Sequence, residues 1–529
     1  MPQAKKQNFL QGAAILAAAV ALVKVIGAVF KIPLANLLSE TGFSHFNIAY
    51  NVYNVLLVIS TAGLPVAVSK MVAESNATGN GGEIPKIIRA AMSTFLVIGF
   101  VGSTLMFVFA EQIAGIMGSP DSVHTIRVIA PASFFVALMS VFRGYYQGLA
   151  NMFPTAISQV IEALCKLVFG LAISWFLISR GYPQEIAAAG AIGGVMIGTV
   201  LGAVFLILRR VFDKNKPSKT GSSRSQSEIT KALMAIAVPV TIGSGVLALT
   251  NFIDAALVLR RLQSAAGFDY EGANFLFGSY SYAQTLFTFP SAFIVPFSMS
   301  VVPAISAAIA RGDRSGAHRT MESSMRITSL LAFPAAAGLS VLAGPILGLL
   351  FANRPEGVAA ATVPLNILAI AVFFNCVVML SNAVLQALGR AKIPVFTMLV
   401  GSVVKIVANW ILVGNPAINI NGAPVGTCLC YLTIMVLNLI IISNHIKPAP
   451  NILRMFGRPF ISTVMMAGTV WAANGLLCRF MSAKIAVLGA IAVAVCVYLV
   501  LIILLKALTR EDLLMIPKGE KIANLLKIK

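Results

Sequence analysis

Apolar stretches of about twenty residues or more follow one another from Phe9 to Leu508, and no segment between them is long enough for a soluble domain. The hydrocarbon core of a bilayer is about 30 Å thick, and a helix needs about twenty apolar residues to cross it. Helices cross lipid in this way because they satisfy their own backbone hydrogen bonds. The sequence therefore predicts an all-α polytopic membrane protein with about 14 transmembrane helices.

The predicted spans leave one long polar interruption, from Asp213 to Glu228, which is typical of a flexible cytoplasmic linker. It divides six spans from the eight that follow. We expect an N-lobe at 1–212, the linker at 213–228, a C-lobe at 229–447, and two further helices with a basic cytoplasmic tail at 448–529. The spans are expected at 9–34, 44–69, 87–110, 125–149, 154–179, 187–208, 232–259, 274–310, 324–351, 358–388, 394–414, 424–446, 460–478 and 485–505.

The loops between the spans differ in charge. One alternate set of loops, together with both termini, holds 27 of the 39 basic residues, and the opposite set holds six. Short loops rich in Lys and Arg stay in the cytoplasm. Both termini are therefore expected to be cytoplasmic.

Composition also argues against several classes of function. The net charge of +21 is spread through short loops rather than gathered on one face with aromatic residues, so no nucleic-acid partner is expected. The four histidines are scattered, and no loop can hold a catalytic domain, so no enzyme and no catalytic residue is expected. All six cysteines lie in apolar stretches, which indicates no disulfide framework, metal site or cofactor. We expect a monomer that contacts membrane lipid and its substrate.

A weak internal repeat favours two related lobes. Gln147-Gly-Leu149 precedes Lys166, and Gln386-Ala-Leu388 precedes Lys405, with nineteen residues from Gln to Lys in both cases. The segment from Pro65 to Ser69 is likewise similar to the segment from Pro303 to Ser306. Many transporters consist of two such lobes around a central cavity and work by alternating access.

Two segments resemble a known family. They are GLPVAVSKMVAE, from Gly63 to Glu74, and SVFRGYYQGLANMFPTAISQVIE, from Ser140 to Glu162. Both resemble the stage V sporulation protein B family. A third segment, from Phe297 to Ser306, is similar to that family and to the related MurJ-type lipid II flippases. The resemblance covers most of the chain and implies the multidrug, oligosaccharidyl-lipid and polysaccharide exporter superfamily. That superfamily has a MATE-like fold of two pseudo-symmetric six-helix lobes, here with two added C-terminal helices.

The resemblance also implies a function. Its members translocate an undecaprenyl-pyrophosphate-linked saccharide across a bacterial plasma membrane for peptidoglycan, spore cortex or another envelope polymer. Such a cargo needs buried cations and polar groups facing an internal cavity, while the lipid tail stays outside. The alternative is a drug or cation antiporter of the multidrug and toxin extrusion (MATE) branch. That branch needs acids in its cavity, whereas six basic residues within the spans face only Glu162 and Asp254.

Charged side chains inside a membrane are rare and usually functional. Lys24 is the deepest in the first span, and Lys31 follows two helical turns later near the same face. The resemblance implies that basic residues here line the substrate cavity, although Lys replaces the Arg that MurJ-type proteins often carry. Lys31 fits a cavity role and a headgroup contact equally well.

Three further cations are candidates for binding the pyrophosphate. Arg143 either contacts the substrate or anchors the inner end of its span. Lys166 follows Glu162 by four residues, so the two fit a helical ion pair as well as a substrate contact. Lys405 is in the corresponding place in the second lobe, without an acid four residues earlier.

Asp254 is the acid deep in the seventh span, where a carboxylate must be protonated, paired or bound to a cation. The resemblance implies a Na⁺ site at this position, with Asn409 and Thr427 as partners, so coupling to Na⁺ or H⁺ is a hypothesis. One departure from the family concerns the cargo. The segment from Tyr282 to Pro290 has no basic residue where Gram-negative lipid II flippases carry one, which argues against lipid II itself.

Overall fold

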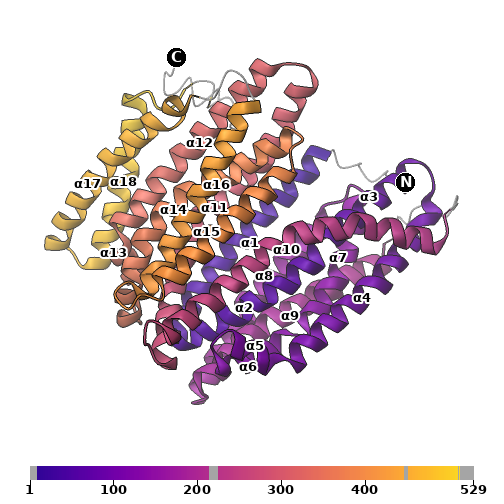
Figure 1. Ribbon diagram of the computed structural model, residues 1–529, viewed down its shortest axis with the longest axis horizontal. Coiled ribbons are helices and arrows are strands. Elements are labelled where there is room, and N and C mark those ends of the chain that lie inside the picture. Colours follow the sequence, from indigo (N-terminus) through magenta and orange to yellow (C-terminus); the bar gives the residue numbers. More distant parts are fainter. Residues whose placement is uncertain (1–8, 214–223, 446–450, 510–511, 513–529) are drawn as a thin grey trace. The chain divides into compact units, whose positions relative to one another are not determined.

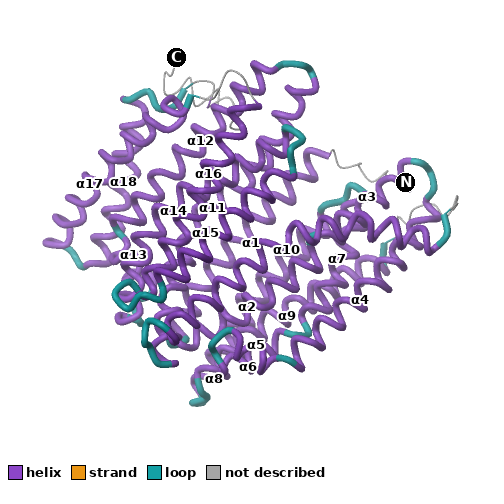
Figure 2. The backbone as a smooth tube through the Cα atoms, viewed as in Figure 1, coloured by secondary structure: helices purple, strands orange, loops and turns teal. Residues whose placement is uncertain are grey.

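The chain folds into long helices in the computed structural model (Figure 1). The structure describes residues 9–213, 224–445, 451–509 and 512. All regular secondary structure in these residues is helical (Figure 2). Thirteen helical stretches among them are long and apolar enough to cross a membrane. The protein is therefore a multi-pass membrane protein with an all-helical fold.

The first half of the chain contains ten α-helices and two short 3-10 helices. Their bounds are α1 (Phe9–Leu37), α2 (Glu40–Thr61), α3 (Gly63–Ala77), η1 (Gly81–Glu83), α4 (Ile84–Val108), α5 (Ala110–Ile116), η2 (Pro120–Ser122), α6 (Val123–Ile129), α7 (Ala132–Gly148), α8 (Phe153–Ser179), α9 (Gln184–Val211) and α10 (Gln226–Ser264).

The second half contains eight α-helices, one 3-10 helix and one π-helix. Their bounds are α11 (Tyr270–Ala310), α12 (Arg314–Val341), α13 (Ala343–Leu350), α14 (Pro355–Ala387), α15 (Lys392–Leu412), η3 (Asn419–Asn421), α16 (Gly422–His445), the π-helix η4 (Leu453–Gly457), α17 (Arg458–Phe480) and α18 (Ala483–Leu504).

Each predicted span lies on one helix or on two consecutive helices. The second span is divided between α2 and α3, because Pro65 lacks the N–H that would bond to the carbonyl of Thr61. The ninth span begins earlier than predicted, since the side chain of Asp313 accepts a hydrogen bond from the Gly316 amide at 2.7 Å and caps α12. The helices thus extend past the apolar segments that predict them.

Contacts divide the chain into two units. The first comprises residues 1–263 with 268–278, and the second comprises 264–267 with 279–529. Helix α10 and the first turns of α11 therefore belong to the first unit. The lobes predicted at 1–212 and 229–447 stay a prediction, and most of the predicted linker lies outside the described residues.

The beginning of α10 is tethered to the turn between α3 and α4. Glu83 is fully buried and accepts hydrogen bonds from Arg224 Nη2 at 2.8 Å and from Arg224 Nε at 3.1 Å. Hydrogen bonding to Glu83 raises the pKa of Arg224. Lys86 Nζ also donates to the Arg224 carbonyl at 2.9 Å, and the Gln226 side chain donates to the Lys86 carbonyl. The tether is one of several contacts between α10 and the rest of the first unit, since Arg260 and Gln263 near the other end of α10 donate to carbonyls of residues 115–118.

A row of glycines brings α9 close to its neighbours. Gly190, Gly194, Gly198 and Gly202 recur every four residues and lie on one face of the helix. A Cβ atom at Gly194 would overlap the backbone of Gly170 in α8. A Cβ atom at Gly198 would lie 2.6 Å from the carbonyl oxygen of Glu162. The row therefore sets the position of α8 through direct backbone contact.

The turns that follow α7 and α14, where the two segments of the predicted repeat lie, have the same hydrogen bonds. The amides of Leu149, Ala150 and Asn151 donate to the carbonyls of Tyr145, Gln147 and Tyr146. The amides of Leu388, Gly389 and Arg390 make the same three bonds, to the carbonyls of Val384, Gln386 and Leu385. The φ angle is 56° at Ala150 and 73° at Gly389. The same three bonds and a positive φ angle recur after α11, at Gly312, and after α18, at Lys506, so this is a common end of a helix and the two related lobes stay a prediction.

The second unit is built around α12, α14 and α16, with α15 packed against α16. The hairpin of α17 and α18 packs on α12 through a core that includes Leu330, Met466, Val470 and Tyr498. The hairpin lies beside α12 at the edge of the unit in Figure 1.

Candidate functional site

A cavity of about 550 Å³ opens within the first unit. Its wall comes from α1, α2, α3, α7, α8 and α9, which pack against one another in Figure 1. Charged and polar side chains face it among apolar ones. The lining residues are Val20, Val23, Lys24, Tyr50, Tyr53, Leu57, Thr61, Pro65, Val66, Ser140, Arg143, Gln147, Gln159, Glu162, Ala163, Lys166 and Val195.

Three of the predicted cations line this cavity, namely Lys24, Arg143 and Lys166. They come from α1, α7 and α8, so residues far apart in the sequence meet at one site. Glu162 is the acid among the lining residues. The formal charge of the lining is therefore positive, which favours an anionic ligand.

Glu162 pairs with Arg143 rather than with Lys166. Arg143 Nη2 lies 3.1 Å from Glu162 Oε2, and Arg143 Nε donates to Ser158 Oγ at 3.0 Å. The side chains of Arg143 and Glu162 are 12% and 25% exposed, so the pair is partly shielded from water. The helical Glu162–Lys166 pair that the spacing suggested is absent from the described ion pairs, because the carboxylate reaches across to α7.

The ammonium group of Lys166 instead lies over two aromatic rings. Its Nζ lies 5.5 Å from the ring centroid of Phe30 and 5.6 Å from that of Tyr50. An ammonium group over a ring face is attracted by the quadrupole of the ring. This contact holds the side chain in the cavity without neutralising its charge. The charge of Lys166 is thus available to bind an anion.

Lys24 is exposed and lies on the wall formed by α1. No acid pairs with it or with Lys166 in the described part of the chain. Two of the three cavity cations are therefore uncompensated, and the third is neutralised by Glu162.

Lys31 lies beside the cavity and is not among its lining residues. Its Nζ donates to Asn47 Oδ1 at 3.3 Å and lies 6.0 Å from the ring centroid of Tyr50. The Tyr50 ring thus has Lys31 and Lys166 as neighbours. Lys31 adds positive potential near the cavity, and a direct ligand contact stays a prediction.

Sequence reasoning missed several polar lining residues. Thr61, Ser140 and Gln159 face the cavity and were not among the predicted site residues. A signal was present for Gln159, since it precedes Lys166 by seven residues and lies on the same helical face. Ser140 has the corresponding relation to Gln147 on α7, seven residues later. Tyr50, Tyr53 and Gln147 also line the cavity.

The other predicted residues are distributed over both units. Lys405 is half-buried on α15, and Asn409 is buried one turn later against Gly426 of α16. Thr427 is buried and donates to the Ala423 carbonyl at 3.0 Å. Asp254 is buried on α10, in the first unit. The ion site of Asp254, Asn409 and Thr427 therefore stays a prediction.

The fold and this cavity define a membrane transporter of the multidrug, oligosaccharidyl-lipid and polysaccharide exporter superfamily, which is not a class of enzymes. Residues 9–309 match the family described as polysaccharide biosynthesis protein, and residues 273–411 match the family described as MatE. The chain belongs to the polysaccharide biosynthesis protein family.

Individual relatives agree with this assignment. The chain is 27% identical to lipid II flippase MurJ of Bacillus subtilis, with 83% of each chain covered. It is 25% identical to stage V sporulation protein B of the same organism, with 97% of this chain and 98% of the relative covered. A solved structure of lipid II flippase MurJ in an inward closed conformation superposes with a TM-score of 0.70 at 15% identity. That superposition covers 92% of this chain and 98% of the other.

Proposed function

We propose that the protein translocates an undecaprenyl-pyrophosphate-linked saccharide across a bacterial plasma membrane by alternating access. The observation that carries this proposal is the cavity of the first unit, where Lys24 and Lys166 are both without an acid partner among the described ion pairs. The relationship to a protein named lipid II flippase MurJ supports a lipid-linked substrate.

The charge of the cavity argues for this cargo over a cationic drug. A cavity that binds cations needs uncompensated acids, whereas Glu162 is held by Arg143. A diphosphate needs two or more cationic groups that it can bridge, since a charge buried in a membrane protein must be paired. The match to the MatE family concerns the shared fold and leaves the ligand open.

In this proposal the residues that line the cavity have different roles. Lys24 and Lys166 bind the pyrophosphate, while Arg143 is fixed by Glu162 and Ser158 and shapes the wall beside it. Tyr53, Gln147 and Gln159 hydrogen-bond to the sugar. The isoprenoid tail stays in the lipid, because transferring its apolar surface into a polar cavity is unfavourable in free energy.

Lys31 of the first unit and Lys405 of the second unit are two further substrate-binding cations in this proposal. Asp254, Asn409 and Thr427 bind Na⁺, or Asp254 binds H⁺, to drive the cycle. Both termini lie in the cytoplasm, since the loops on their side hold most of the basic residues.

The test is complementation of a bacterial strain depleted of all its lipid II flippases. We expect Lys24→Ala to abolish rescue and Lys24→Arg to retain it, because arginine preserves the charge at the same depth. Arg127→Ala is the matched control, since Arg127 forms an exposed pair with Glu111 at 2.7 Å outside the cavity lining. Membrane levels of each variant are measured alongside growth.

The outcomes separate the hypotheses. Equal rescue by Lys24→Ala and by the wild type would remove Lys24 from the binding site. No rescue by the wild type, together with binding of another undecaprenyl-pyrophosphate saccharide by the purified protein, would keep the transport class and change the cargo. Resistance to cationic drugs in place of rescue would favour an antiporter.

A further inference from the structure

An apolar groove runs between α12 and α18 in the second unit, with a volume of about 540 Å³. Its lining on α12 extends from Ile327 to Leu339, which is about 18 Å of helix. Its lining on α18 extends from Ile491 to Ile502. An acyl chain spans one leaflet of the bilayer, and the hydrocarbon of one leaflet is about 15 Å thick. The groove is therefore long enough for the chain of a membrane lipid.

The groove offers a ligand almost no polar groups. Tyr498 is the lining residue with a polar side chain, and its hydroxyl already donates to the Leu330 carbonyl at 2.9 Å. The remaining wall consists of side chains such as Leu331, Ala494 and Leu499. Only an apolar chain can fill such a space without leaving polar groups unpaired.

One end of the groove is held in place by a buried ion pair. Arg326 Nε lies 2.7 Å from Asp512 Oδ2, and Arg326 Nη2 lies 2.7 Å from Asp512 Oδ1. Thr509 Oγ1 donates to Asp512 Oδ2 at 2.8 Å. Leu508, the residue before Thr509, lines the groove. Because Arg326 and Asp512 neutralise each other, the charge at this end comes from other residues.

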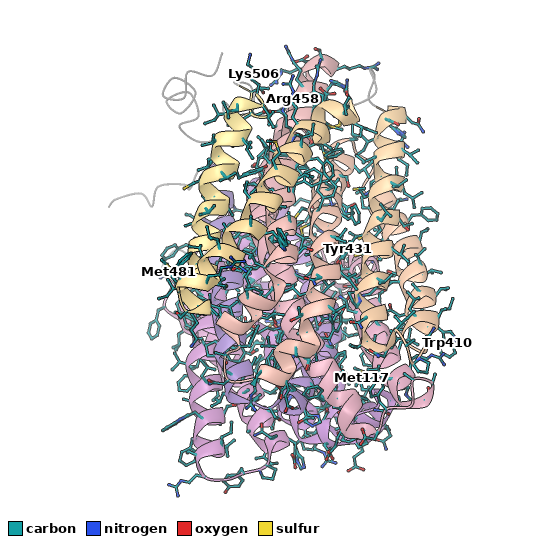
Figure 3. The ribbon with its side chains drawn as sticks, turned by 90° about the vertical axis from the view of Figure 1, so that its left-hand side faces the viewer. Met117, Trp410, Tyr431, Arg458, Met481 and Lys506 are labelled. Carbon is teal, nitrogen blue, oxygen red and sulfur yellow. The ribbon has the colours of Figure 1, made fainter. Side chains whose placement is uncertain are left out.

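Two such residues in the described part of the chain are Arg458, at the start of α17, and Lys506, just after α18. Arg458 Nη1 donates to the Lys506 carbonyl at 2.9 Å, and both side chains are exposed. No acid pairs with either one in the described part of the chain. Figure 3 shows the two residues at the same end of the α17–α18 hairpin, while Met481 lies at the other end.

We propose that this groove is a binding site for an anionic phospholipid such as phosphatidylglycerol. One acyl chain lies between α12 and α18, and the headgroup phosphate binds Arg458 and Lys506. The charges decide the class of lipid, because basic residues at the end of an apolar groove attract an anionic headgroup over a zwitterionic one. This lipid is distinct from the proposed cargo, since its groove is lined by residues of the second unit and the cavity proposed for the cargo is lined by residues of the first.

The test is binding of labelled phosphatidylglycerol and of phosphatidylcholine with the same chains to the full-length protein in detergent. We expect the wild type to prefer phosphatidylglycerol. The double variant R458Q/K506Q should bind it about thirtyfold more weakly, since each basic residue near an anionic headgroup changes affinity about fivefold. The matched control R479Q/K484Q removes two cations from the opposite end of the same hairpin and should bind as the wild type does.

A second pair of variants tests the groove itself. Ala494→Phe fills the groove and should abolish binding, whereas Ala467→Phe lies against another apolar cavity, beside α16, and should leave binding unchanged. Equal affinity for the two phospholipids would overturn the proposal, as would unchanged binding by R458Q/K506Q. Displacement of phosphatidylglycerol by undecaprenyl phosphate at equal concentration would reassign the groove to the tail of the cargo. The assay measures no transport, so failure of the proposed function would leave its result intact.

Discussion

The cavity cations of the first unit differ in whether an acid pairs with them. Arg143 is bound to Glu162 and Ser158, while Lys24 and Lys166 have no acid partner among the described residues. A charge that is already paired gains little from a ligand, because the ligand must first displace its partner. The two lysines therefore dominate the attraction for an anion.

We expect Glu162→Gln to lower the free energy of unfolding by about 2 kcal/mol, because it leaves the partly buried Arg143 without its anion. The double variant R143M/E162Q should recover most of that loss, since it removes both charges. Thermal unfolding of the purified variants, analysed as a double-mutant cycle, measures the coupling. Purely additive losses would show that the pair contributes nothing.

The sequence identified the cavity cations but not their pairing. Lys24, Arg143 and Lys166 could be selected because charges within apolar spans stand out. The Arg143–Glu162 contact could not, because it depends on how α7 and α8 pack, which a spacing of four residues along one helix does not report. Ser140 and Gln159 were missed because polar uncharged residues also serve packing between helices.

At the scale of the helix, the glycine row on α9 positions the residues of the site. Gly198 lies against the backbone of Glu162, so any side chain there pushes α8 away from α9. The same displacement would move Lys166 relative to its aromatic rings.

We expect Gly198→Leu to destabilise the protein by about 1–3 kcal/mol through overpacking. Gly193→Ala on the same helix is the control, because the nearest atom to its Cβ, in Val128, would be 3.9 Å away. Detergent-solubilised variants are compared by thermal unfolding. A Gly198→Leu variant as stable as the control would show that α8 and α9 separate easily.

The two matching turns give a paired prediction. Both Ala150 and Gly389 have positive φ angles, which suit glycine better than alanine. Ala150→Gly should therefore stabilise the protein, and Gly389→Ala should destabilise it, each by about 1 kcal/mol. Opposite shifts in melting temperature are expected, and shifts of the same sign would refute the structural equivalence of the turns.

At the scale of the whole molecule, the hydropathy of the chain was sufficient to place all fourteen predicted spans on helices. The contact between Arg224 and Glu83, which joins the start of α10 to the turn between α3 and α4, was not predictable, and the lobes at 1–212 and 229–447 stay a prediction. A buried ion pair that joins distant segments leaves no periodic signal in a sequence.

The orientation of the molecule can be tested by labelling single cysteines in intact cells. After the exposed Cys478 and Cys496 are replaced by serine, we expect a cysteine at Gly181 to react with a membrane-impermeant maleimide. A cysteine at Gly79 should react only after the cells are opened, because its loop lies on the side that is rich in basic residues. The reverse pattern would place both termini outside the cytoplasm.

Because Glu83 and Arg224 bind each other, we expect the polypeptide to tolerate a break in the chain between them. A break between residues 214 and 223 would leave Arg224 on the second fragment and Glu83 on the first, with their hydrogen bonds available. Two co-expressed halves would thus carry complementary ends and could rejoin without a covalent link. The gene could then be divided at this point so that each half carries its own reporter.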